Sequence, residues 1–341
     1  QSLNAIRDGL LSPSVPTIGT TTTNPQIKGD LNDWANAGYF GRINYNYKGR
    51  YLFEANGRYD GSYRFVGDNR WGFFPSFSAG WNVANEDFFS KFVSSISLLK
   101  LRASWGALGN MNTQNLYPFF LTMPITTSGG GWLINNQQPN VAGTPGIVSQ
   151  TLTWERVESF DVGLDWAFFK NRLTGSFDYF RRNTKGMVGP APQLPSILGT
   201  GVPNINNTDM KSFGYEVEMA WRDRINTVHY GIKVLFANDK QIITNYPNEI
   251  MNFSNWYSGK VNGEIWGFTT IGIAQSAEEM NNHLSKLNNG GQGYFGSNWA
   301  AGDIMYADLN GDGKVDMGAG TLRDPGDMHI IGNNYPQYKT G

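Results

Sequence analysis

The amino-acid sequence predicts an all-β protein, and more narrowly part of a large antiparallel transmembrane β-barrel with long extracellular loops. Three observations predict this class: two-residue alternation over about 10 residues at a time, apolar faces crowded with aromatic residues opposite faces that carry full charges, and connections that tend to alternate between short and long. Soluble sheets also alternate, so the chemistry of the two faces decides between the classes.

The first two predicted strands show the pattern most clearly. Between Tyr39 and Asp60 the odd positions carry aromatic and small apolar side chains, and the even positions carry polar and charged ones; the turn 48–50 separates the strands. Phe40 and Leu52 break the pattern, and both stand near strand ends. Aromatic residues at strand ends suit the two interfaces of a bilayer, and charges on the opposite face suit a water-filled lumen.

Six further segments repeat this alternation. Tryptophans stand on the apolar faces of four of them, whereas Lys100, Arg102, Asp161 and Asp165 stand on polar faces. The eight predicted strands are 38–47, 51–62, 72–83, 97–106, 157–168, 173–184, 213–222 and 229–240.

The connections between these strands form two sets. Because antiparallel strands place alternate connections at opposite ends of a sheet, each set falls at one end, and outer-membrane barrels have short turns at one end and long loops at the other. The connection 84–96 is an exception, because it is longer than 63–71 in the other set. The shorter set is 48–50, 84–96, 169–172 and 223–228, and the longer set is 63–71, 107–156, 185–212 and 241 onward.

This division predicts the organisation of the chain. We expect residues 1–37 to be an extracellular loop segment that leads into the barrel, and residues 38–240 to hold the eight strands with their loops. Residues 241–334 should form a long extracellular loop region, and residues 335–341 should begin the next strand. The start at Gln1 and the end at a new strand predict a piece of a longer protein.

Composition excludes several classes. Of the 341 residues, 14% are aromatic and only 16% are charged, which is low for a soluble globular chain. The net charge of −1 gives no reason to expect a nucleic-acid partner. No apolar run reaches the length of about 18 residues that a transmembrane helix needs. The absence of cysteine fits a protein of the cell envelope.

Several motifs, in one order along the chain, resemble the barrel of SusC/RagA-type TonB-dependent outer-membrane transporters. The resemblance extends from about Tyr39 to Pro336. The matching segments are YFGRINYNY (39–47), YLFEANGRYDGS (51–62), FPSFSAGW (74–81), LKLRASWG (99–106), Leu164-Asp165 with NRLTGS (171–176), and DLNGDG (308–313).

This resemblance implies a multi-pass barrel of about 22 strands in the cell outer membrane, with a plugged lumen. It also implies partners: a SusD-like surface lipoprotein as a lid, TonB acting through plug and contact segments absent from this chain, and outer-membrane lipid. The implied function is TonB-dependent import of oligosaccharides or oligopeptides, without covalent chemistry, so no enzyme is expected.

The segment 308–316 predicts a calcium loop. It reads D-x-N-x-D-G-x-x-D, in which oxygen ligands recur at alternate positions and Gly313 permits a sharp turn. Ca²⁺ would be held by the side chains of Asp308, Asn310, Asp312 and Asp316 and by the carbonyl of Lys314. Ala319 stands where an EF-hand loop has its bidentate glutamate, so a turn whose side chains bond the backbone is the alternative.

Other motifs predict no chemistry. The G-x-G-x-x-G match at 291–296 follows a Gly/Asn-rich stretch, so a loop is favoured over a dinucleotide site. The three histidines have no spacing that suits zinc. Glu155, Glu158 and Asp161 are better explained as carboxylates of the lumen or rim than as a glycosidase pair. The sequence Ser276-Ala277-Glu278-Glu279 predicts the start of a short helix that ends near Leu284.

Aromatic residues in the long loops are the candidate substrate contacts. Trp132, Trp256, Tyr257 and Trp299 stand among glycines and amides, where ring faces can pack on sugar or peptide and amides can bond to hydroxyl or backbone groups. Tyr294 and Phe295 lie in the same kind of context. The alternative is that these rings pack on one another or on the lipoprotein lid.

Two other function classes stay open from the sequence. One is a passive porin or surface adhesin, which would lack a plug. The other is a soluble or secreted calcium-dependent carbohydrate-binding β-protein, against which the outward aromatic faces argue. The sequence does not distinguish a glycan substrate from a peptide, and it does not give the oligomeric state or the occupancy of the calcium loop.

Overall fold

The structure, a computed structural model, describes residues 2–6, 26–30, 33–92, 95–113, 116–121, 123, 125–127, 140–191, 197, 200–336 and 338–341. It forms two units, Gln1–Ala37 and Gly38–Gly341. In the first unit the strands β1 (Ser2–Ile6) and β2 (Gln26–Asp30) pair antiparallel. No helix among the described residues is long and apolar enough to cross a membrane.

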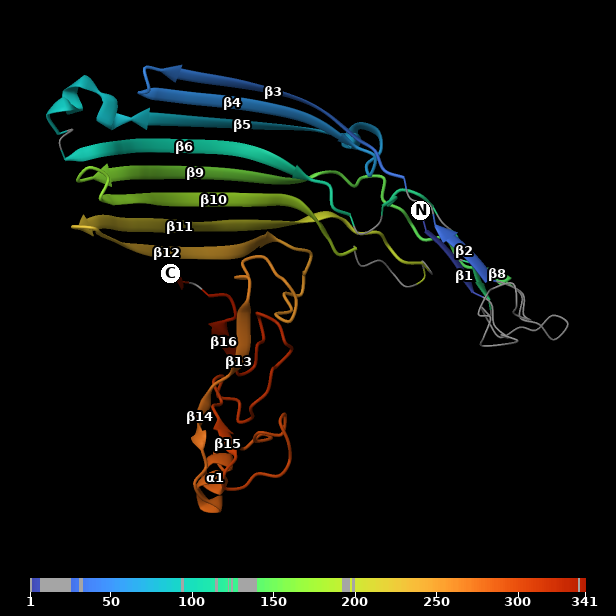
Figure 1. Ribbon diagram of the computed structural model, residues 1–341. Coiled ribbons are helices and arrows are strands. Elements are labelled where there is room, and N and C mark those ends of the chain that lie inside the picture. Colours follow the sequence, from blue (N-terminus) through green and yellow to red (C-terminus); the bar gives the residue numbers. More distant parts are fainter. Residues whose placement is uncertain are drawn as a thin grey trace, which may run out of the picture. The chain divides into compact units, whose positions relative to one another are not determined.

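The second unit is built on one large sheet in which long strands lie side by side in chain order (Figure 1). The order is β17-β12-β11-β10-β9-β6-β5-β4-β3, and the pairings from β4 to β17 are antiparallel. Within the described residues β3 and β17 are the edges of the sheet. The strands are β3 (Asn36–Tyr47), β4 (Tyr51–Ser62), β5 (Trp71–Asn82), β6 (Ile96–Asn110), β9 (Glu155–Phe168), β10 (Leu173–Gly189), β11 (Ile205–Ile225), β12 (Val228–Asn245) and β17 (Tyr338–Thr340).

Each of the eight predicted ranges holds a strand, and the mostly antiparallel all-β fold is confirmed. Three strands, β10, β11 and β12, extend well beyond their predicted ranges of 173–184, 213–222 and 229–240. The register between β10 and β11 shifts between Thr184 and Met187, and Gly186 has a φ of 65°. A β-bulge of this kind adds an unpaired residue and resets the alternation, so the two-residue pattern is lost although pairing continues.

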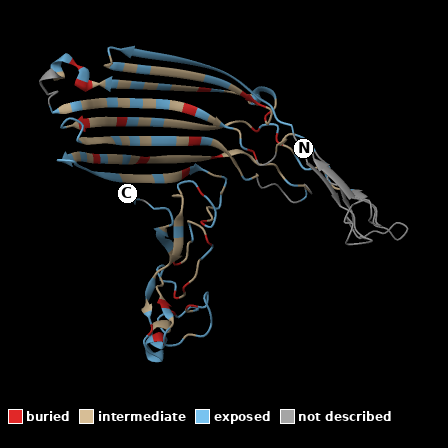
Figure 2. Ribbon diagram, in the orientation of Figure 1, coloured by how far each residue is buried: buried red, intermediate tan, exposed pale blue. Residues whose placement is uncertain are grey.

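The two faces of this sheet differ in chemistry, and few of its side chains are buried (Figure 2). We call the face with the outward aromatic residues the aromatic face: Ile43 on β3 is 68% exposed, Phe73 on β5 is 56% exposed, and Ile232 on β12 is 66% exposed. A soluble protein rarely leaves so large a contiguous apolar surface uncovered. The opposite face, which carries Arg102 and the carboxylates around it, is called the polar face below.

Short connections close one end of the sheet. The turn after β3 uses positive φ at Lys48 and Gly49, and the turn after β9 uses positive φ at Phe169, Lys170 and Asn171. The connection between β5 and β6 is longer and contains two short 3₁₀ helices, η3 (Val83–Asn85) and η4 (Asp87–Phe92). At the other end, η2 (Gly67–Arg70) connects β4 to β5, and β7 (Ile125–Thr127) pairs with β8 (Asn140–Ala142).

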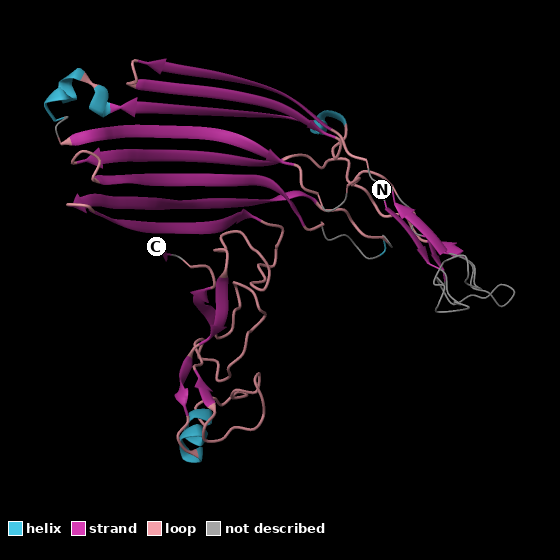
Figure 3. Cartoon of the chain, in the orientation of Figure 1, coloured by secondary structure: helices cyan, strands magenta, loops and turns pink. Residues whose placement is uncertain are grey.

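The segment after β12 contains small ladders and one helix (Figure 3). β13 (Glu264–Phe268) pairs with β16 (Met328–Asn333), and β14 (Thr270–Ile273) pairs with β15 (Ile304–Tyr306). The helix α1 (Ala277–Leu284) begins at Ser276, whose hydroxyl accepts the Glu279 N–H, so the predicted helix start is confirmed. Met280 of α1 packs with Ala274 and Met305 in a small buried cluster beneath the helix.

Candidate functional site

The polar face of the sheet is the candidate functional site, and Arg102 on β6 lies at its centre. Its guanidinium donates to three carboxylates: Nη1 to Asp161 at 3.1 Å, Nε to Asp165 at 3.2 Å, and Nη2 to Asp178. The two aspartates of β9 flank Gly163, which is the register partner of both Arg102 and Asp178. Three neighbouring strands are therefore joined by one side chain.

Gly163 makes this arrangement possible. A Cβ atom at position 163 would lie 2.4 Å from Arg102 Cζ and 2.7 Å from both Nη atoms. The guanidinium therefore occupies the space that a side chain on β9 would take, and this is how it reaches Asp178 on β10. The four side chains are 19–32% exposed, so the pairs are partly shielded from water.

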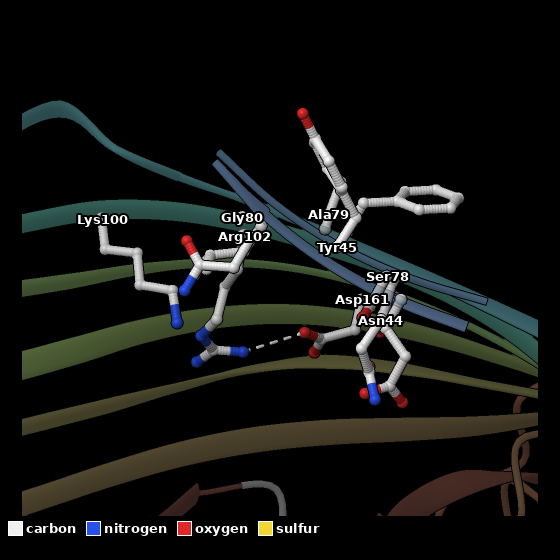
Figure 4. A pocket seen from close by; sticks show the side chains of 14 residues that line it. Asn44, Tyr45, Ser78, Ala79, Gly80, Lys100, Arg102 and Asp161 are labelled. Carbon is white, nitrogen blue, oxygen red and sulfur yellow. Dashed lines mark hydrogen bonds and ion pairs between the residues drawn. The ribbon is translucent and has the colours of Figure 1, made fainter. Parts of the chain in front are cut away.

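Further ion pairs extend the charged surface across the sheet. Arg42 and Glu54 join β3 to β4 at 2.7 Å, and Lys233 and Glu218 join β12 to β11 at 2.7 Å. A hollow of about 430 Å³ borders Glu54, Lys100, Arg102 and Asp161, among other residues. In Figure 4, Tyr45 points to one side of the sheet, whereas Lys100, Arg102 and Asp161 point to the other.

The carboxylates that could suggest a glycosidase are paired instead. Glu158 bonds Arg156 at 3.0 Å and Lys185 at 3.1 Å, and Glu155 accepts from Asn110 at 3.3 Å. Asp161 belongs to the Arg102 group. Such a surface can hydrate and brace a lumen and can bind polar groups through paired charges.

The predicted calcium ligands all lie in one turn, but their oxygens accept hydrogen bonds from its backbone. Asp308 accepts from Gly311 N at 2.6 Å and from Gly313 N at 2.9 Å, and Asn310 accepts from Asp312 N at 2.9 Å. Within the described residues, no group of three or more His, Asp or Glu side chains is placed to hold a metal ion. The side chains as they stand therefore do not form a cage for a cation.

A lysine supplies the positive charge in this turn. Lys314 Nζ lies 2.7 Å from Asp316 Oδ2 and 3.9 Å from Asp312 Oδ2. The bond from Lys314, together with the Gly318 N–H, holds the pKa of Asp316 below its usual value. The calcium site itself is untested by these contacts and stays a prediction.

Asp327 organises the same turn, and sequence reasoning missed it. This carboxylate is fully buried and accepts from Leu309 N at 2.7 Å, from Asn310 N at 3.3 Å and from Asp316 N at 2.9 Å. A buried carboxylate needs such partners to offset its loss of water. Asp327 lies outside the segment 308–316 in the sequence, so no regular spacing of residues connected it with the turn.

The predicted substrate contacts are placed differently from one another. Trp256 is 37% exposed and lies edge-on to Tyr246, and Trp299 packs against the cluster beneath α1. Tyr257 is only 5% exposed, which leaves little of its ring for a ligand. Trp132 lies outside the described residues. None of these positions tests substrate binding.

Tyr257 belongs to a bonded group at the base of this segment. Its hydroxyl donates to Glu264 Oε1, which also accepts from Trp266 Nε1 at 3.1 Å. Burial, and to a lesser extent the bond to Glu264, raises the pKa of Tyr257. Burial lowers the pKa of Lys260, whose ammonium lies 5.2 Å from the Tyr257 ring centre. Lys260 donates to two backbone carbonyls, so the group fixes the start of the segment.

Tyr294 and Phe295, the other loop aromatics, pack on neighbouring rings. Phe295 stacks on Tyr306 with ring centres 4.2 Å apart and meets Phe268 edge-on at 4.7 Å. Tyr294 also lies against Phe295, at 5.1 Å. Contacts within the chain therefore account for much of this aromatic surface.

The sheet, with one exposed aromatic face and one charged face, defines a segment of a membrane-spanning β-barrel. The profile of a family described as TonB dependent receptor-like, beta-barrel, matches residues 4–326. The chain belongs to this family of outer-membrane β-barrel proteins.

Individual relatives agree with this assignment. The chain is 28% identical over 325 residues to TonB-dependent receptor P3 of Formosa agariphila, covering 91% of this chain and 30% of that protein. It is 28% identical over 301 residues to TonB-dependent receptor SusC of Bacteroides thetaiotaomicron, covering 82% and 27%. The chain thus spans somewhat under a third of the length of these curated relatives.

A solved structure shares the fold. The RagAB peptide importer in its closed-closed state aligns with a TM-score of 0.65 and 21% identity, over 77% of this chain and 29% of that one. The predicted resemblance to SusC/RagA-type barrels and the predicted outer-membrane location are confirmed.

Proposed function

We propose that the full-length protein imports nutrients across the outer membrane and that this chain supplies part of its barrel wall. The observation that carries the proposal is the pairing of the two faces on one sheet. The aromatic face suits lipid, and the charged face around Arg102 suits a hydrated lumen through which polar solutes pass. Membership of the TonB-dependent receptor family supports a role in import.

The finer proposal names the substrate class and the partners. The substrates are oligosaccharides or oligopeptides, a SusD-like surface lipoprotein covers the extracellular side, and TonB supplies the energy. Support comes from relatives: one is named SusC, and the structure with the same fold is described as a peptide importer. The barrel performs no covalent chemistry in this proposal.

The first experiment isolates the full-length protein from its own outer membrane. Detergent extraction, purification by a tag and mass spectrometry should recover a barrel whose gel mobility changes on boiling, with a surface lipoprotein in equal amount and bound oligosaccharide or peptide. Recovery as a soluble protein without a lipoprotein would contradict the proposal and favour a secreted binding protein.

A second experiment separates an energised importer from a passive porin. Uptake of the co-purified substrate by whole cells should stop when a protonophore collapses the energy supply to TonB. Diffusion through a passive porin would continue at the same rate, and that result would overturn the importer proposal.

The predicted calcium loop has its own test. If Ca²⁺ binds the turn 308–316, it must displace the Lys314 ammonium from Asp316, and added Ca²⁺ should slow tryptic cleavage after Lys314. Mg²⁺ serves as the matched control, because it requires a tighter octahedral site. Equal cleavage rates with and without Ca²⁺ would leave the backbone-bonded turn as the full explanation.

A further inference from the structure

The connection between β5 and β6 lies at the end of the sheet where the short turns lie, and it bonds to residues at the rim of the aromatic face (Figure 1). Its key residue is Glu86, which is only 8% exposed although it lies in a connection. Trp81 Nε1 donates to Glu86 Oε1 at 2.9 Å, and the Tyr51 hydroxyl also bonds this carboxylate. Tyr51 and Trp81 are register partners on β4 and β5, and both stand on the aromatic face.

The polar tips of two aromatic-face residues therefore converge on one carboxylate. Aromatic residues with polar tips collect where the acyl chains of a membrane meet the headgroups. Here those tips bond a protein carboxylate, and this bond holds residues 83–92 at the same level. Glu86 thus fixes the connection beside the outer surface of the sheet, at the rim of the aromatic face.

The neighbouring turn holds the connection from a second side. Arg50 donates to Glu86 at 3.3 Å and to Asp87 at 2.6 Å, and Asn85 Nδ2 donates to Gly49 O at 3.0 Å. These contacts involve residues of both 3₁₀ helices, and none of them uses the Phe88 side chain. The Phe88 side chain is left 66% exposed.

We propose that residues 83–92 are an interfacial anchor that lies in the headgroup layer of the phospholipid leaflet, with Phe88 inserted at the boundary with the acyl chains. Phospholipid is the occupant because the surface continues the lipid-facing aromatic side of the sheet through Trp81 and Tyr51. An exposed lysine at the same rim, Lys48, has its ammonium 5.4 Å from the Tyr47 ring centre, where it can meet lipid phosphate.

The test places a nitroxide spin label at position 88. The chain contains no cysteine, so a single Phe88→Cys substitution labels one place in it, and any cysteine elsewhere in the full-length protein is replaced by serine. The full-length protein is reconstituted in vesicles of phosphatidylethanolamine and phosphatidylglycerol. The frequency at which the label collides with oxygen, which partitions into lipid, is compared with the frequency at which it collides with a water-soluble nickel chelate.

Two reference positions calibrate this comparison. Tyr45→Cys reports the lipid-facing surface, and Asp68→Cys in η2 reports water at the opposite end of the sheet. We expect the oxygen-to-nickel ratio at position 88 to be severalfold higher than at position 68 and to lie below that at position 45. A ratio equal to that at position 68 overturns the proposal, and so does a label shielded from both reagents, which would show a covering protein.

A second pair of variants tests the role of Glu86 with the label at position 88. Glu86→Ala removes the acceptor shared by Tyr51, Trp81 and Arg50, and we expect the label to become more mobile and its collision ratio to fall toward the water reference. Asp87→Ala removes one exposed partner of Arg50 but keeps the bonds of Glu86 to Tyr51, Trp81 and Arg50, so it should change both readings much less than Glu86→Ala does. A label unaffected by Glu86→Ala would contradict the anchoring mechanism. The change in gel mobility on boiling confirms that each variant is folded.

Discussion

Gly163→Ala should destabilise the barrel, and it should do so through Arg102. The new methyl group would stand 2.4 Å from Arg102 Cζ, far inside van der Waals contact, so the guanidinium must move away from β9. The backbone itself tolerates alanine, because a strand interior favours alanine over glycine by roughly 0.5–1 kcal/mol. The cost therefore comes from the displaced ion pairs.

The contacts of Arg102 give the expected magnitude. A hydrogen bond to a charged group contributes about 1.5–3 kcal/mol, and displacing the guanidinium breaks at least the one to Asp178, which lies beyond Gly163. The lost bond less the gain in backbone propensity gives an expected cost for Gly163→Ala of about 0.5–2.5 kcal/mol in the native chain, and the same change should stabilise by about 0.5–1 kcal/mol when Arg102 is already alanine. The resulting coupling energy is about 1.5–3 kcal/mol.

A double-mutant cycle measures this coupling. The native protein, Gly163→Ala, Arg102→Ala and the double variant are unfolded by urea in vesicles, and loss of the heat-modifiable gel band reports unfolding. If Gly163→Ala costs the same with and without Arg102, the steric explanation is refuted. Gly41→Ala is the matched control, because a Cβ atom there meets nothing within 4 Å.

Two further predictions concern the connections. Bonds from Tyr51 and Trp81 lower the pKa of Glu86. The contribution of Glu86 to holding residues 83–92 is therefore complete above the ordinary pKa of 4.5 and is lost as the pH falls below that value. The mobility of a label at position 88 should rise only on acidification past this point. Asp327→Ala leaves three backbone N–H groups without an acceptor, so cleavage by trypsin after Lys314 should accelerate at least several-fold. The control Asp312→Ala should change the cleavage rate little. Equal cleavage rates in the two variants would contradict the central role of Asp327.

Local alternation was sufficient to predict the sheet, because successive residues of a strand face two different environments and the contrast is visible within the sequence of each strand. Phe73, Phe77 and Trp81 recur at every fourth position of β5, always on the same face, and this regularity does not depend on the neighbouring strands. The prediction stopped short at Thr184 because the bulge beside Gly186 changes the parity of β10. A bulge depends on how the strand pairs with its neighbour, and the sequence of one segment does not reveal that pairing.

The candidate site was predicted only in part, for a similar reason. Arg102, Asp161 and Asp165 were recognised as residues of the polar face, but their meeting at Gly163 depends on register across three strands. Glu86 and Asp327 gave no signal at all. Each carboxylate acquires its role from donors that folding brings to it from other elements of the chain.

The sequence by itself determined the class of protein, the identity of the strands and the chemistry of the two faces. Those properties follow from the two-residue period of a strand, which is fixed by backbone geometry. Only the tertiary structure decided that Gly163 makes room for Arg102, that Asp327 holds the turn 308–316, and that Glu86 holds residues 83–92 against Tyr51 and Trp81. These depend on distances between side chains remote in sequence, and register and packing set such distances.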